Sequence, residues 1–130
     1  MRTSQKTPGT IATIGIDLGK NTFHLVGLDK RGAIALQRKV SRSQLEHRLC
    51  NVPRCLIGME ACSGSHHIGR QLTALGHDVR LIPAQHKSDY RDAEAIAEAV
   101  LRPTMSFVAV KTPEQMDLLV LHRVRSRLVG

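Results

Sequence analysis

The chain has few aromatic residues: its 130 residues include two Phe, one Tyr and no Trp. Proteins that hold single-stranded nucleic acid by base stacking depend on aromatic side chains, so the composition disfavours that mode of binding. The core must then be aliphatic, and hydrophobic residues at 42% of the chain are enough for one domain.

Cysteines and long apolar runs are also scarce. Cys50, Cys55 and Cys62 are odd in number and show no CxxC spacing, which favours reduced thiols in a cytoplasmic protein. We expect no signal peptide, because Met1–Gly9 contains no apolar run. No stretch approaches the roughly 20 apolar residues of a membrane span, so we expect no membrane partner.

Acidic residues are outnumbered, since 11 Asp and Glu stand against 19 Lys and Arg. The net charge is +8 and the sequence pI is about 10.1. A basic balance of this size favours a polyanionic partner, most simply DNA or RNA. A basic protein without such a partner stays open as the alternative.

The order of the expected elements predicts an α/β domain. Residues 1–9 are polar, and we expect them to be disordered. Strands at 10–18, 22–28 and 33–40 form an antiparallel meander. Helices and strands then alternate, which implies a mixed sheet flanked by helices. These later elements are a helix from Ser41 or Ser43 to Cys50, a strand at 55–59, a helix from Ser63 that ends at Gly76, a strand at 79–82, a helix from Ser88 or Asp89 to about Leu101, a strand at 105–110 and a helix from Thr112.

Four acids stand where separate elements would bring them together. Asp17 ends the apolar first strand, and Glu60 follows the strand at 55–59. Asp89 and Asp92 are three residues apart at the expected start of a helix, which would place both on one face of it. Four converging carboxylates suit Mg²⁺ or Mn²⁺ and the cleavage of phosphodiesters. In the plainer interpretation the acids cap a turn, end a strand or complement a helix dipole.

Three basic residues flank these acids in the sequence, namely Lys20, Lys87 and Arg91. They are candidates for phosphate contacts beside the metal, and charge-balancing surface residues are the alternative. His66 and His67 have no further His or Cys at zinc spacing, which favours an exposed helix start over a zinc site.

Three motifs of the chain resemble those of one known family. Gly15–His24 is similar to the opening of the insertion sequence 110 family of transposases, relatives of the Piv DNA invertases. Gly58–Gly64 and Lys87–Ala97 resemble the second and third motifs of that family. The resemblance implies a RuvC-like, RNase H-like fold, a mixed sheet with a three-strand antiparallel meander flanked by helices. It also implies a catalytic and metal-binding Asp-Glu-Asp-Asp (DEDD) tetrad, which would consist of Asp17, Glu60, Asp89 and Asp92.

The resemblance also implies a function. Family members are DNA recombinases that move or invert elements with Mg²⁺ or Mn²⁺, and some are guided by a structured RNA. We expect the full-length protein to be a homo-oligomer. Residues 10–110 would form the catalytic domain, and residues 111–130 a helix that leads toward a C-terminal domain with a nucleophilic serine, before which this chain stops. Residues 83–87 are shorter than the basic loop that the family has before its third motif.

Two other functions fit parts of the sequence. Gly15–Gly19 also resembles the phosphate loop of actin-like and sugar-kinase ATPases, although the second glycine-rich loop of those proteins is missing. A non-catalytic module that binds nucleic acid, or dimerises through its last helix, would use the acids only structurally.

Overall fold

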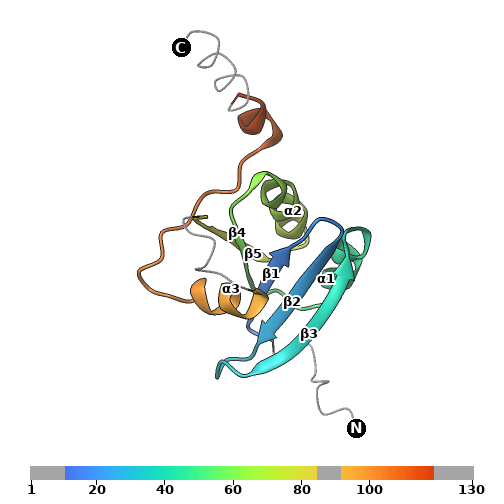
Figure 1. Ribbon diagram of the computed structural model, residues 1–130, viewed down its shortest axis with the longest axis vertical. Coiled ribbons are helices and arrows are strands. Elements are labelled where there is room, and N and C mark those ends of the chain that lie inside the picture. Colours follow the sequence, from blue (N-terminus) through green and yellow to red (C-terminus); the bar gives the residue numbers. More distant parts are fainter. Residues whose placement is uncertain (1–10, 85–91, 119–130) are drawn as a thin grey trace.

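The computed structural model describes residues 11–84 and 92–118, and in them five strands form one mixed sheet (Figure 1). The strands are β1 (Thr13–Leu18), β2 (Thr22–Leu28), β3 (Ile34–Ser41), β4 (Leu56–Glu60) and β5 (Asp78–Ile82). Their order is β3-β2-β1-β4-β5, with the first three strands antiparallel, β4 parallel to β1 and β5 parallel to β4. The predicted meander and the predicted RNase H-like mixed sheet are confirmed.

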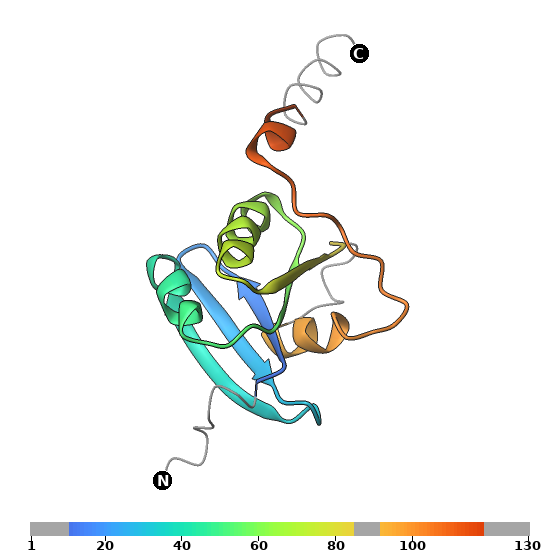
Figure 2. The same ribbon diagram turned by 180° about the vertical axis from the view of Figure 1, so that it is seen from behind.

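Helices cover both faces of this sheet (Figures 1 and 2). After β3, the short 3₁₀ helix η2 (Arg42–Gln44) leads into α1 (Leu45–Cys50). α1 and α2 (Ser63–Ala74) pack on one face, and α3 (Ala93–Ala99) packs on the other. The alternation of helices and strands in the sequence therefore produces a three-layer domain.

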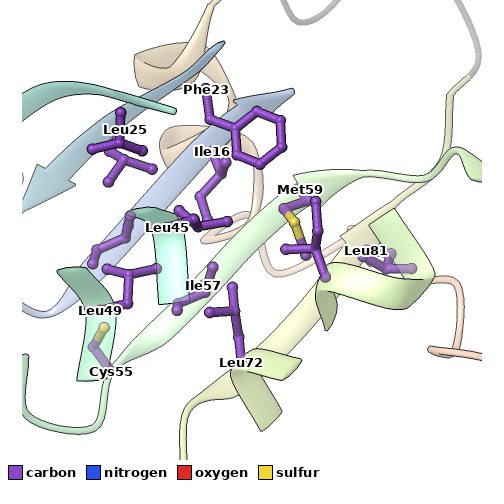
Figure 3. Close-up of a cluster of buried hydrophobic side chains, with 13 residues drawn as sticks. Ile16, Phe23, Leu25, Leu45, Leu49, Cys55, Ile57, Met59, Leu72 and Leu81 are labelled. Atoms are coloured by element: carbon purple, nitrogen blue, oxygen red, sulfur yellow. The ribbon is translucent and has the colours of Figure 1, made fainter. Parts of the chain in front are cut away.

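The larger core lies between the sheet and the helices α1 and α2 (Figure 3). Successive side chains of a strand point to opposite faces, so alternate strand residues such as Ile16 and Met59 enter this core together with Phe23. Leu49 of α1 and Leu72 of α2 close it from the helix side, and all five side chains are fully buried. Aliphatic side chains supply most of this core, as the composition predicts.

Two strand glycines allow α3 to lie directly on the other face. A Cβ atom at Gly15 would overlap the carbonyl oxygen of Ala93 and would lie 2.5 Å from the nitrogen of Ala97. A Cβ atom at Gly58 would lie 2.8 Å from the Cβ atom of Val100. The backbone of α3 is thus held against β1 and β4, which fixes where the N-terminus of this helix points.

The start of α3 corrects one prediction. The helix begins at Ala93, and Asp92 before it is the N-cap with extended backbone (φ −153°, ψ −179°). The predicted start at Ser88 or Asp89 is therefore wrong, and so is the expectation that Asp89 and Asp92 share a helix face. An N-cap residue has extended backbone and stands outside the helical turns that follow it. Ile96 and Val100 face the sheet as predicted.

Other boundaries differ in detail. The helix predicted from Ser41 or Ser43 begins with η2, whose N-cap is Ser41, and the backbone N–H of Ser41 is 3.5 Å from Oε1 of Gln44. Residues 105–110 make one isolated bridge, between Val108 and Leu81 of β5, and no strand.

The chain leaves the sheet along the β5 edge and reaches a helix at 113–118 (Figure 1). Thr112 caps this helix as expected: its Oγ1 accepts the N–H of Gln115 at 3.1 Å, and Gln115 Oε1 accepts the N–H of Thr112 at 2.8 Å.

The predicted disorder of residues 1–9 lies outside the described residues. Within the described part of the chain, no helix is long and apolar enough to cross a membrane.

Two side chains of α2 bind the backbone of Lys111, which precedes the helix at 113–118. His66 Nδ1 accepts the N–H of Lys111 at 3.0 Å, and the Arg70 guanidinium donates to its carbonyl oxygen. His66 is buried, so the exposed helix start expected from the sequence is wrong for this residue and holds for His67. Burial, with the positive charges of Lys111 and Arg70, lowers the pKa of His66 from its ordinary value of 6.5.

Candidate active site

The carboxyl ends of β1 and β4 bring two of the predicted acids to one face of the sheet. In the parallel β1–β4 pair Gly15 is opposite Gly58 and Ile16 is opposite Met59. Asp17 and Glu60 each stand one residue further along. Both are two residues beyond a glycine that faces α3, so strand alternation directs both side chains to the α3 face.

Asp92 reaches the same face from the N-terminus of α3. Its Oδ1 accepts the backbone N–H of Ala95 at 2.9 Å, which is the usual bond of an N-cap carboxylate. This bond fixes the position of an exposed carboxylate and leaves its second oxygen for another partner. The close packing of α3 on Gly15 determines where along β1 this carboxylate stands.

A hollow of about 460 Å³ lies between the start of α3 and the strands β1, β2 and β3. Asp17, Asp92 and Glu94 are on its acidic side. In the strand register, Asp17 of β1 lies opposite His24 of β2, and His24 lies opposite Lys39 of β3. These three residues therefore form a row across the sheet. The full lining is Asp17, His24, Leu25, Val26, Gln37, Arg38, Lys39, Asp92, Ala93 and Glu94.

Of the predicted tetrad, the structure brings Asp17 and Asp92 into one hollow. Glu60 lies on the same face at the matching position of β4 but is not among the residues that line the hollow. Lys20 is exposed in the β1–β2 turn, where Gly19 N–H donates to Thr22 O at 3.1 Å. The remaining predicted site residues, Asp89, Lys87 and Arg91, lie outside the described residues.

Four residues of the hollow were missed by the sequence analysis: His24, Arg38, Lys39 and Glu94. The register of β2 against β1 and of β3 against β2 places His24 and Lys39 beside Asp17, whereas Glu94 comes from the first turn of α3 and Arg38, which alternates with Lys39, borders the hollow with its side chain on the other face of β3. A sequence signal existed for His24 and Lys39, because both are polar positions of alternating strands that a meander brings next to Asp17.

The donors fit a hard divalent cation in kind, since carboxylate oxygens are the ligands that Mg²⁺ prefers. Asp17, Glu60 and Asp92 come from three elements and share one face. Among residues 11–84 and 92–118, however, no three His, Cys, Asp or Glu side chains are close enough to hold a metal ion. A complete metal site therefore needs a further ligand or a closer approach of these acids.

The cysteines stand apart from this site. Burial raises the pKa of Cys55 to about 11, so its thiol is not a nucleophile at neutral pH. His77 packs beside it, with Nδ1 3.3 Å from the Cys55 nitrogen and Nε2 3.0 Å from the Leu49 carbonyl oxygen. Cys50 and Cys62 are exposed free thiols. All three cysteines are unbridged, as predicted.

Comparison with known proteins gives a consistent match. The family model for the DEDD domain of IS110 transposases, described as a transposase, matches residues 14–130. A transposase for insertion sequence element IS1328 from Yersinia enterocolitica is 44% identical over 127 residues, which cover 92% of this chain and 38% of that relative. A probable family 20 transposase from Pseudomonas aeruginosa is 42% identical with the same coverage. A transposase for insertion sequence element IS1111A from Coxiella burnetii is 38% identical, and the match covers 35% of that relative. The chain thus spans little more than a third of the length of these relatives.

Proposed function

Because the chain belongs to the insertion sequence 110 (IS110) family of transposases, we propose that it supplies a divalent-metal centre for DNA strand cleavage and transfer in transposition. One observation carries the proposal. Asp17 and Glu60 occupy matching positions on one face of adjacent parallel strands, beside the α3 N-terminus that bears Asp92. This placement supports a DEDD tetrad in which Asp89 would be the fourth member by motif match.

Asp17, Glu60, Asp89 and Asp92 would hold one or two Mg²⁺ ions, with Mn²⁺ as a substitute. When bound, such ions supply an activated water and stabilise the departing 3′ oxygen. The hydrogen bond that Asp92 Oδ1 accepts from Ala95 N–H would hold this carboxylate in place for the role. The acid-rich side of the hollow would also repel the phosphate backbone, so cation binding and DNA binding are expected to favour each other.

The opposite side of the hollow would hold the DNA. Lys39 offers a cationic group to phosphate oxygens, and His24 between Lys39 and Asp17 offers a hydrogen bond to the same phosphate. Lys20 at the β1–β2 turn, together with Lys87 and Arg91, would contact phosphates on either side. The scissile phosphate would then lie over His24, between the basic edge and the acids.

We assign residues 10–110 to the catalytic domain and residues 111–130 to a helix that leads toward a further transposase domain. Complete transposition would need that further domain, because this chain spans about 38% of the IS1328 transposase. A structured guide RNA and homo-oligomerisation belong to the same proposal for the full-length protein.

Thermal unfolding against Mg²⁺ and Mn²⁺ tests the metal centre. A ligand at about a hundredfold its dissociation constant stabilises the fold by about 2.7 kcal/mol, which raises the midpoint by roughly several degrees. We expect this rise in the wild type and in the control Asp117→Asn, whose carboxylate is exposed on helix 113–118. We expect no rise in Asp17→Asn. Equal rises in all three proteins would contradict the proposal.

The alternative of a non-catalytic nucleic-acid-binding module is favoured by one observation, the absence of a three-ligand cluster among residues 11–84 and 92–118. Incubation with branched DNA separates the two functions. A catalytic domain nicks the DNA only with Mg²⁺ or Mn²⁺ and loses this activity in Asp17→Asn. A binding module gives no nicks, and its DNA affinity is the same in Asp17→Asn as in the wild type.

A further inference from the structure

A second hollow, of about 670 Å³, lies at the same end of the sheet as the first but on the opposite face, which α1 and α2 cover. It opens beside α1 and α2, and its lining comes from the β1–β2 turn, the end of β3, η2, the first turn of α1 and residues 64–71 of α2. The polar residues of this lining are Asn21, Ser41, Arg42, Ser43, Glu46, His67 and Gln71. Apart from the single carboxylate of Glu46, these groups offer a positive charge and hydrogen-bond donors.

Arg42 is the distinctive residue of this second hollow. Its guanidinium carbon lies 5.8 Å from the centroid of the Phe23 ring, so the side chain is oriented by a cation–π contact. No carboxylate of the described residues forms an ion pair with it. An oriented guanidinium without an acidic partner, facing a polar hollow, is suited to binding an external phosphate.

The two hollows are joined by the end of β3. Lys39 lines the first hollow and Arg42 lines the second. The two hollows open on opposite faces, and three residues of extended chain span at most about 10 Å, so a DNA backbone that contacts both passes round the β3 edge of the sheet. The β1–β2 turn makes the same link, because Asp17 lines the first hollow and Asn21 lines the second.

From this arrangement we infer that the second hollow is a phosphate-binding subsite for DNA. It holds the backbone of the strand a few nucleotides from the phosphate in the first hollow, with Arg42 as the principal contact and His67 as a second donor. The inference rests on the proposed function, since it takes DNA as the molecule in the first hollow. A contact of this kind adds affinity without sequence preference, because it reads only the phosphate backbone.

Fluorescence anisotropy with labelled branched DNA tests the subsite, measured on the whole chain as a function of salt. Arg42→Gln is expected to weaken binding to all sequences and to lower the slope of log K against log salt by about one. Arg42→Lys keeps the charge and is expected to retain most of the slope. Arg48→Gln, an exposed arginine of α1 outside both hollows, is the matched control and is expected to bind like the wild type.

Two results would overturn the subsite. One is Arg42→Gln binding with the affinity and salt slope of Arg48→Gln, at an unchanged thermal midpoint. The other is a loss confined to an RNA hairpin, with DNA binding intact. Either result leaves the metal centre untouched, because the metal response of the wild type against Asp17→Asn is measured without nucleic acid.

Discussion

At the scale of single residues, the row from Lys39 through His24 to Asp17 has a basic end and an acidic end. The antiparallel pairs place these side chains next to one another on the face of α3. The basic end of the row suits phosphate, and the acidic end, continued by Glu60 on β4, suits a cation. A phosphodiester over His24 would contact both ends at once.

Lys39 is therefore expected to contribute to DNA affinity through phosphate alone. Lys39→Gln should weaken DNA binding uniformly across sequences and lower the salt slope by about one. Lys30→Gln is the matched control, because Lys30 is an exposed lysine in the β2–β3 turn at the far end of the hairpin. Anisotropy titrations at several salt concentrations measure both variants, and equal salt slopes for the two would count against the assignment of Lys39.

At the scale of elements, the position of α3 decides whether the acids can act together. The helix lies on Gly15 and Gly58, where side chains would push it away from the sheet. Val26, Leu28, Ala93 and Ala97 form a small buried cluster at its N-terminal end. The glycines of β1 and β4 therefore serve the site by letting α3 approach Asp17.

Gly15→Ala should destabilise the fold by about 1–3 kcal/mol, the usual cost of overpacking, because the new Cβ atom overlaps the backbone of α3. It should also weaken the metal response by displacing Asp92. Gly64→Ala is the control of opposite sign: its Cβ atom would meet nothing within 4 Å, and alanine in a helix is favoured over glycine by up to about 1 kcal/mol. Chemical denaturation measures both changes, and a Gly15→Ala protein as stable as the wild type would refute the packing argument.

The contact between α2 and Lys111 should depend on pH. His66 accepts the Lys111 N–H in its neutral form, and its folded-state pKa lies below the unfolded value of 6.5. The unfolded chain thus takes up the proton first, so this stabilisation is complete above about pH 6.5 and declines as the pH falls through the folded pKa.

The His66→Asn variant tests this dependence, because the asparagine oxygen replaces the Nδ1 acceptor without titrating. Thermal midpoints from pH 7.5 to 5 should fall less in His66→Asn than in the wild type. In His67→Asn, which changes the exposed neighbour, the thermal midpoint should fall by as much as in the wild type. Parallel curves for all three proteins would contradict a buried His66 that resists protonation.

The sequence predicted the strands well and the third motif less well. β-branched runs with period two, separated by Asp29–Gly32, were enough to place the meander, and motif resemblance supplied the fold. The start of α3 was misplaced because Ser88, Asp89 and Asp92 are all good N-cap residues, and packing on Gly15 selects the last of them. His24 and Glu94 were missed because strand register and helix placement, which depend on tertiary contacts, bring them to the hollow.

At the scale of the whole molecule, the net charge of +8 and the placement of the acids have opposite effects on DNA. The general positive charge attracts the polyanion over distance, whereas the acids on the α3 face oppose a phosphate unless a cation neutralises them. The chain covers 38% of the Yersinia enterocolitica relative. The part described here would supply the metal centre and a basic edge.

The central claim is that acids from β1, β4 and the start of α3 hold one metal centre. Affinity cleavage by Fe²⁺ in place of Mg²⁺, with added hydrogen peroxide and ascorbate, tests it most directly, because the hydroxyl radicals that bound Fe²⁺ forms from peroxide cut the nearest backbone. We predict cuts beside Asp17, Glu60 and Asp92 together, suppressed by excess Mg²⁺, lost in Asp17→Asn and kept in Asp117→Asn. Cuts near only one of these segments, or cuts that Mg²⁺ does not suppress, would contradict a shared metal centre.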